Sequence, residues 1–251
     1  MTVEQEQFLT VRSLATGYSS GFVIEAHTHR WHQLLFASSG AMTVRAGRYS
    51  WMVPPGRAVF IPAGCAHTIR MWGNVAMRSL YFSPALCHFA RDCEVLEVTP
   101  LLRELILRVI ELTALDSRVA THQRLLETLM DEIDQQMRER PGTPLMVPLP
   151  WERRALNLTH HVLDDPAASE NIDRLARRFG MGRRTIERLF HEQTGMSFGL
   201  WRQKVRMLDS IRLLAEEKSV TETALATGYS SVSAFIAAFK RTFGFTPGKL
   251  T

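Results

Sequence analysis

Four side chains in the first third of the chain have the types and spacing of a metal or ligand site. His27 and His29 are two residues apart, Gln33 follows them, and His67 comes later. In an extended strand, residues two apart point to the same face, so both imidazoles enter one space. Three converging imidazoles suit a divalent metal such as Zn, Ni or Fe, with one position left open. The same groups would also suit hydrogen bonding in a pocket for an organic molecule.

The same residues resemble the two cupin motifs, HxHxxxE and GxxxxxPxGxxH. The second motif is complete at Gly56, Pro62, Gly64 and His67, whereas Gln33 stands where metal-binding cupins have a glutamate. A neutral amide stabilises a cation less than a carboxylate does, so both the metal and the organic ligand stay open. The resemblance implies a jelly-roll barrel.

The surrounding sequence has the pattern of a small β-barrel. Between residues 21 and 84, seven short runs rich in Val, Ile, Phe, Trp and Tyr are separated by Gly- and Pro-containing turns, which is typical of an all-β sandwich or barrel. Aromatic side chains are dense here. Most are expected in the core, and a subset facing the lumen would suit a small planar effector. The candidate effector-binding residues are His27, His29, Trp31, Gln33 and His67.

A second set of chemically useful side chains lies on a helix predicted over residues 182–194. Arg184, Glu187 and Arg188 recur at i, i+3 and i+4, which places them on one exposed stripe. Arginine contacts guanine edges or phosphates, and glutamate accepts from a cytosine amino group. The alternative is a solvated charged face on a helical bundle, or a Glu187 that only orients an arginine. The apolar residues of this helix form the opposite stripe: Ile186, Leu189 and Phe190.

An internal repeat favours the DNA-binding interpretation. Residues 171–247 contain the same helix-turn-helix unit twice, with one extra residue in the second turn. Ala176 and Gly180 match Ala224 and Gly228 at a shift of 48. Beyond the turn the shift is 49, and the matched pairs are Ile186 with Phe235, Phe190 with Phe239, Gly195 with Gly244, and Ser197 with Thr246.

The second copy and its closing GFTP, Gly244 to Pro247, resemble the C-terminal domain of the AraC/XylS family of transcription regulators. The resemblance implies two recognition helices in successive major-groove segments of double-stranded DNA. Ala237 stands where relatives often carry arginine, so we expect the first helix to provide most of the sequence discrimination. Thr223 stands where an aliphatic residue is usual. The DNA-binding residues carried over are Arg183, Arg184, Glu187, Arg188, Ser231, Val232, Ser233, Ile236, Ala237, Lys240 and Arg241.

Composition and charge agree with this division. Residues 1–150 carry 14 basic and 14 acidic side chains, whereas residues 151–251 carry 16 and 11, so the excess positive charge lies in the repeat. No apolar run is long enough to span a membrane and no signal peptide is visible, which predicts a cytoplasmic protein. Cys65, Cys87 and Cys93 have no CxxC spacing, so we expect packing residues and no disulfide framework.

These observations predict an α+β multidomain chain in four parts. Residues 1–98 form a cupin-like sensor barrel, residues 99–140 a helical segment, residues 141–150 a proline-rich extended linker, and residues 151–251 an all-α tandem helix-turn-helix domain. Amphipathic helices over residues 101–110 and 125–137 would cover the barrel or form an antiparallel seam between two subunits of a homodimer.

The function expected is a non-enzymatic, sequence-specific transcription regulator, with activation as the expected mode. Its barrel would sense a small molecule or metal and control operator binding or contact with RNA polymerase. Two alternatives are a metal-dependent cupin enzyme with a DNA-binding tail, and a ligand-independent regulator whose barrel serves only for dimerisation. Gln33 argues against the enzyme, and no second set of acid and base groups is evident.

Overall fold

The computed structural model describes residues 7–86, 92–139, 145–166, 168 and 170–250. The chain divides into two compact units. The first contains residues 1–46 and 53–143, and the second contains residues 47–52 and 144–251. The boundary between residues 143 and 144 falls within the linker predicted over residues 141–150. Among the described helices, none has the length and apolar character needed to cross a membrane.

The described β-strands form two antiparallel sheets. Their orders are β10-β1-β8-β3-β6-β9 and β11-β5-β4-β7-β2. The strands are β1 (Leu9–Tyr18), β2 (Val23–His27), β3 (His32–Ala37), β4 (Ala41–Ala46), β5 (Tyr49–Val53), β6 (Arg57–Ile61), β7 (His67–Trp72), β8 (Val75–Phe82), β9 (Glu94–Glu97), β10 (Ala114–Asp116) and β11 (Met146–Pro148). This confirms the β-rich N-terminal region and its seven predicted strands, β2 to β8.

Four strands were missing from the sequence prediction. β9, β10 and β11 have three or four residues each, which is too short to show a period-2 pattern. β1 alternates weakly because both of its faces are only partly covered. β11 lies inside the segment expected to be an extended linker, where Pro148 pairs with Tyr49. Proline is tolerated there because β11 is an edge strand.

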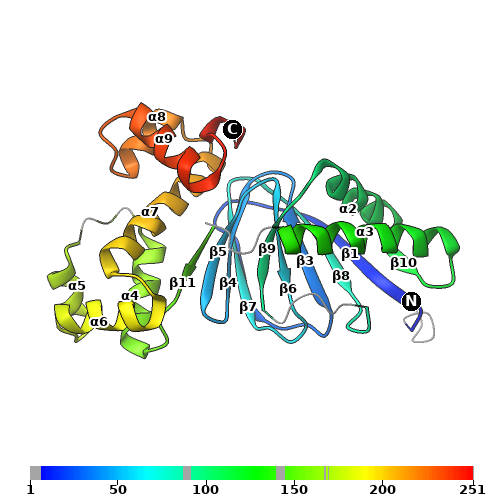
Figure 1. The fold of residues 1–251 in the computed structure, drawn as a ribbon, viewed down its shortest axis with the longest axis horizontal. Coiled ribbons are helices and arrows are strands. Elements are labelled where there is room, and N and C mark those ends of the chain that lie inside the picture. Colours follow the sequence, from blue (N-terminus) through cyan, green and yellow to red (C-terminus); the bar gives the residue numbers. More distant parts are fainter. Residues whose placement is uncertain (1–6, 87–91, 140–144, 167, 169, 251) are drawn as a thin grey trace. The chain divides into compact units, whose positions relative to one another are not determined.

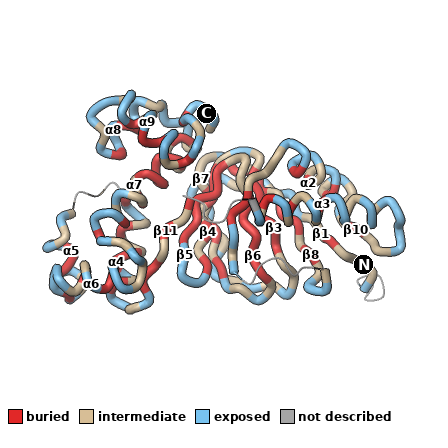
Figure 2. Tube along the Cα trace, viewed as in Figure 1, coloured by how far each residue is buried: buried red, intermediate tan, exposed pale blue. Residues whose placement is uncertain are grey.

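Two helices, α2 (Pro100–Leu112) and α3 (Ala120–Glu139), cover one face of the six-stranded sheet (Figures 1 and 2). Leu34 pairs with Phe60 on one side and Leu80 on the other, so all three share this face. Covering the barrel is one of the two roles expected for these helices, and the seam between two subunits stays a prediction. The buried cluster between them contains Val11, Leu34, Phe36, Phe60, Leu80, Phe82 and Leu96 from strands, and Leu102, Ile106, Val109, Leu129 and Ile133 from the helices.

The second unit is helical and contains the repeat. Its helices are α4 (Arg153–Asp164), α5 (Ile172–Arg178), α6 (Arg183–Thr194), α7 (Phe198–Ala215), α8 (Val220–Ala226) and α9 (Val232–Phe243), followed by the 3-10 helix η1 (Pro247–Lys249). Asn171 caps α5, where its side chain accepts from Arg174 N at 2.9 Å. The helical architecture predicted for the C-terminal region is confirmed.

The two helix-turn-helix units use the same turn geometry. Gly180 and Gly228 both have positive φ, 63° and 87°, a conformation that glycine adopts at little cost. After each turn the backbone returns to the buried alanine: Met181 N donates to Ala176 O at 2.8 Å, and Tyr229 N donates to Ala224 O at 2.9 Å. The second turn, residues 227–231, is one residue longer than the first, as the shift in the repeat predicts.

Helix α7 joins the units through a buried aromatic core. Trp201 packs edge-on against Phe190 of the first unit, with ring centroids 5.3 Å apart. Its indole Nε1 donates to Pro148 O at 2.8 Å, which ties α7 to β11. The second unit has its own aromatic core, in which Phe239 packs edge-on against Phe235 and Phe243.

Thr223 gives the first testable expectation. Its side chain is fully buried and its Oγ1 has no hydrogen-bond partner among the described residues. Replacing the hydroxyl with a methyl group removes an unsatisfied buried polar atom, so Thr223→Val should raise the free energy of unfolding by about 1 kcal/mol. Urea unfolding of the full chain, with amide exchange followed in α8, measures this.

Thr227 provides the matched control. Its Oγ1 donates to Thr223 O at 2.7 Å and to Ala224 O at 3.1 Å. Thr227→Val should therefore lower the stability of the same turn by roughly 1 kcal/mol. If Thr223→Val and Thr227→Val changed the free energy of unfolding equally, the unpaired hydroxyl of Thr223 would not be the cause of a stability cost.

Candidate functional site

Three histidines meet at one end of the N-terminal unit. His27 ends β2 and His67 begins β7, and the two residues are paired directly across the strands. Their ring centroids are 4.2 Å apart. His29 follows in the turn before β3, with its ring centroid 5.1 Å from that of His67. The nitrogen atoms that could bind a metal ion all lie within 4.8 Å of one another. We call these three residues the histidine triad.

A backbone carbonyl holds each ring of the triad. A carbonyl only accepts, so each Nδ1 carries a proton, and in a neutral ring Nε2 then keeps its lone pair. Metal-binding histidines are oriented in this way by hydrogen bonds from the other ring nitrogen. The acceptors of His27, His29 and His67 are Glu25 O at 2.9 Å, Trp31 O at 2.5 Å and Cys65 O at 2.9 Å.

His67 is the most buried member of the triad. Its side chain is 2% exposed, and its Nε2 has no hydrogen-bond partner among the described residues. The pKa of His67 is lowered from 6.5 to about 4, mainly by burial; the Cys65 carbonyl opposes this lowering, and the nearby rings of His27 and His29 add to it. His67 is therefore neutral at pH 7, which is the form that binds a metal ion.

Gln33 connects the triad to the sheet. It is 1% exposed, and its amide lies 3.0 Å from His29 Nε2 and 3.0 Å from Ser79 Oγ. The third neighbour is the Tyr81 hydroxyl at 3.2 Å. In the structure Gln33 Oε1 faces His29 Nε2, and Gln33 Nε2 donates to Ser79 Oγ and to the Tyr81 hydroxyl. Because Trp31 O also accepts from this ring, a neutral His29 requires the opposite amide orientation, in which the nitrogen donates to Nε2 and the oxygen accepts from the hydroxyls. Gln33 thus orders His29, and this bond must open before His29 can bind anything else.

The triad fits a divalent transition metal in its donor set. Imidazole nitrogens bind such ions at about 2.1 Å, so two ligands of one ion lie at most about 4.2 Å apart. The triad reaches that spacing after a small inward movement. Three neutral imidazoles with an open fourth position form the type of site in which an ion keeps a water molecule or an exogenous ligand.

Trp31 also borders this region, and its expected contact with an effector stays a prediction. Its carbonyl orients His29, and its ring lies under the Arg12 guanidinium, 4.5 Å from the ring centroid. The cation–π contact fixes the indole. The sequence motif places Trp31 near the triad but contains no signal for Arg12, which comes from the unpredicted strand β1.

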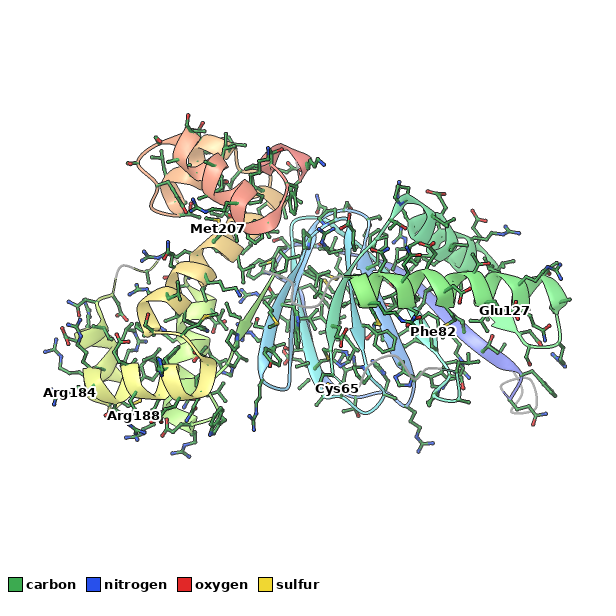
Figure 3. All side chains as sticks on the ribbon, viewed as in Figure 1. Cys65, Phe82, Glu127, Arg184, Arg188 and Met207 are labelled. Carbon is green, nitrogen blue, oxygen red and sulfur yellow. The ribbon has the colours of Figure 1, made fainter. Side chains whose placement is uncertain are left out.

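Among the predicted DNA-binding side chains of α6, Arg183, Arg184 and Arg188 are exposed; Figure 3 labels Arg184 and Arg188. Arg188 donates to Glu192 Oε2 at 2.8 Å. Arg184 has no ion pair or hydrogen bond with any described residue, whereas Arg183 lies 4.0 Å from Asp173. Glu187 is half-buried and accepts from Phe198 N at 3.2 Å, so it caps the start of α7.

The corresponding face of α9 is small and apolar, with basic groups at its end. Ser233, Ala237 and Lys240 are exposed, and Ser231 caps the helix by accepting from Ala234 N at 3.2 Å. The remaining residues expected to contact DNA are also accessible: Val232 and Ile236 are half-buried, and Arg241 is exposed.

Two arginines on α7 were missed by the sequence analysis. Arg202 donates to the carbonyls of Ala168 and Glu170, and Arg206 Nε donates to Pro166 O at 3.3 Å, so both hold the segment that precedes α5. Burial and then the charge of Arg206 lower the pKa of Arg202. Both line a cavity of about 340 Å³ beside the turn at residues 227–229. Their i, i+4 spacing on α7 was the available signal.

The triad leads to a pH dependence of stability in metal-free protein. The folded-state pKa of His67 is about 4 and its ordinary value is 6.5. Between pH 4 and pH 6.5, His67 therefore binds a proton in the unfolded chain but not in the folded one. The stability contribution is complete above pH 6.5 and is lost as the pH falls towards 4. Acidification from pH 7 to pH 5 should lower the free energy of unfolding by about 2 kcal/mol.

Urea unfolding with a chelator present measures this loss. His67→Gln should flatten the profile in this range, while His191→Gln, at an exposed position of α6, should leave it unchanged. A profile for His67→Gln that is parallel to that of wild type would mean that another group causes the loss.

Comparison with known proteins agrees with both units. Residues 12–147 match the family model described as AraC-like ligand binding domain, and residues 175–251 match a helix-turn-helix domain model. The regulator NimR of Escherichia coli is 32% identical over 223 residues, which are 89% of this chain and 80% of that protein. The regulator RipA of Corynebacterium glutamicum is 33% identical over 125 residues, 50% of this chain and 37% of that protein.

Solved structures give weaker similarities. ToxT from Vibrio cholerae is 12% identical with a TM-score of 0.38, covering 96% of this chain and 97% of that one. The DNA-binding domain of AdpA, solved with a target DNA, is 31% identical with a TM-score of 0.33, covering 37% and 85%. The family models and the regulator sequences carry the assignment: the chain belongs to the AraC family of DNA-binding transcription regulators and has an N-terminal ligand-binding domain.

Proposed function

We propose that the histidine triad is the effector site of this regulator and that it binds a divalent transition metal, Zn, Ni or Fe. The observation that carries the proposal is the shared orientation of the rings. Three separate carbonyls hold the three Nδ1 atoms, and one ring nitrogen of each histidine lies within 4.8 Å of the other two. A site that only accepted hydrogen bonds from an organic ligand would not require all three rings to have the same tautomer.

Two features of the triad suit a sensor better than a permanent structural ion. Gln33 contributes no negative charge, and its bond to His29 competes with an incoming ion. Both lower the affinity, so occupancy would follow the free concentration of the effector. A fourth position would accept water or a small organic molecule, which keeps a combined metal and organic effector within the proposal.

The effector acts on DNA binding through a population shift. A ligand changes the balance between two arrangements of the chain only when it binds them unequally. In the proposal, the two arrangements differ in the His29–Gln33 hydrogen bond, which an effector would break when it binds His29. We place the protein in the cytoplasm as a homodimer that contacts RNA polymerase, and we assign it no enzymatic activity, because its relatives are transcription regulators.

In the DNA-binding unit, we assign sequence discrimination to α6 and phosphate anchoring to α9. Arg184 has no partner to release before it contacts DNA, whereas Arg188 must leave Glu192. Glu187 caps α7, which favours a positioning role over a contact with cytosine. On α9, Ser231, Lys240 and Arg241 suit phosphate, and Ile236 and Ala237 suit thymine methyl groups.

Metal binding is tested on protein purified without a histidine tag. We expect one Zn²⁺, Ni²⁺ or Fe²⁺ per chain by titration calorimetry, with thermal stabilisation that grows with free metal. His67→Ala should abolish binding, and His160→Ala in α4 should not. If only an organic metabolite stabilises the protein, the effector is that organic molecule and not a metal. If neither metal nor metabolite stabilises it, the result supports a barrel that only dimerises.

The assignment of α6 is tested with operator DNA at fixed salt. Arg188→Ala should weaken operator binding by about 1–3 kcal/mol and relax selectivity at one base pair. Glu192→Gln removes the competing carboxylate and should strengthen binding without changing the preferred sequence. Wild-type selectivity in Arg188→Ala, together with lost selectivity in Ser233 or Ile236 variants, would transfer base recognition to α9.

A further inference from the structure

Two thiols lie close together beside the histidine triad. The Sγ atoms of Cys65 and Cys93 are 3.7 Å apart, and both residues are free and half-buried. Strand pairing brings them together. β6 pairs with β9, and Phe60, near the end of β6, lies opposite Glu94, the first residue of β9. Cys93 directly precedes β9, and Cys65 lies in the turn that follows β6 (Figure 3). Cys87 lies outside the described residues.

The turn that carries Cys65 also holds the triad. Cys65 O accepts from His67 Nδ1 at 2.9 Å, and Gly64 N donates to His29 O at 2.8 Å. The turn is closed by Cys65 N donating to Pro62 O at 3.2 Å. A displacement of Cys65 is therefore transmitted directly to the ring of His67 and to the backbone of His29.

We propose that Cys65 and Cys93 form an oxidative modification site, at which a hydroperoxide closes a disulfide that disorganises the histidine triad. The first part is independent of the proposed effector. The second part rests on the proposed role of the triad. The regulator would then respond to two inputs, the ligand of the triad and the oxidant.

The chemistry requires one equivalent of hydroperoxide. The Cys65 sulfur attacks one peroxide oxygen, the O–O bond breaks, and the other oxygen leaves as water, or as an alcohol, with the thiol proton. The Cys93 sulfur then attacks the resulting sulfenic acid, the S–S bond forms, the S–O bond breaks, and water leaves with the second proton. The two thiols lose two electrons and two protons, which the peroxide gains. Burial, and then the Cys65 thiol, raise the pKa of Cys93, which suits Cys65 as the first site of attack.

Closing the disulfide requires the sulfur atoms to approach from 3.7 Å to about 2.05 Å. In the proposed site, part of this approach is a displacement of the Cys65 backbone, in addition to rotation of the side chains. Because Cys65 supplies the acceptor of His67, the shift weakens the bond that orients Nε2. Loss of such an orienting partner typically reduces metal affinity about 10- to 100-fold.

The test begins with the full-length reduced protein and one equivalent of hydrogen peroxide. We expect the intact mass to fall by two hydrogens, a Cys65–Cys93 peptide in a non-reduced digest, and reversal by a dithiol reductant. Cys65→Ser and Cys93→Ser should each prevent the bond, and Cys87→Ser should not. Absence of this disulfide, or its formation only with Cys87, would overturn the proposal.

The coupling has two readouts. Zn²⁺ affinity should fall at least about 10-fold in the oxidised wild type and remain unchanged after peroxide treatment of Cys93→Ser. In metal-free protein, the imidazole NMR signals of His67 should shift on oxidation of wild type alone. Unchanged signals with a formed disulfide would overturn the coupling. A protein that binds no metal when reduced, but shows both the disulfide and the NMR shift after oxidation, would refute the metal effector and retain this oxidation site.

Discussion

The hydrogen bond from each triad imidazole to a backbone carbonyl is the interaction on which the proposed sensing function depends. It places a proton on the Nδ1 of His27, His29 and His67, which leaves Nε2 as the ligand atom of each neutral ring. The carbonyls belong to residues two positions away, so the local backbone determines the direction of each ring. A change in the strand ends or turns would therefore affect the triad without altering a histidine.

The triad combines a rigid part and an adjustable part. His67 is buried and neutral, which makes its unpartnered Nε2 a standing cost that a bound ion or donor would relieve. His29 already has a partner in Gln33. An incoming ligand would therefore relieve the unpaired Nε2 of His67, and it would have to displace Gln33 from His29. In the proposed sensor, this balance lowers the affinity, so that occupancy changes with the effector concentration.

The DNA-binding unit shows how a duplicated scaffold can carry unequal contact surfaces. Both turns use a glycine with positive φ, and both recognition helices end at a left-handed glycine. These positions are constrained by backbone geometry and agree in the two copies. The exposed positions are not constrained by packing, and they differ: α6 carries arginines, and α9 carries small and apolar residues. Scaffold and contact surface can thus diverge independently.

The sequence by itself determined the features that repeat with a regular period or spacing: seven strands, the covering helices, the tandem helix-turn-helix units and the two histidine motifs. It missed β9 to β11 because strands of three or four residues have no measurable period. It also left open what each site side chain does. Tertiary structure decided that Glu187 caps α7, that Arg188 pairs with Glu192, and that Cys65 approaches Cys93. These contacts join residues from different elements or depend on rotamers, so their distances follow from packing and not from sequence spacing.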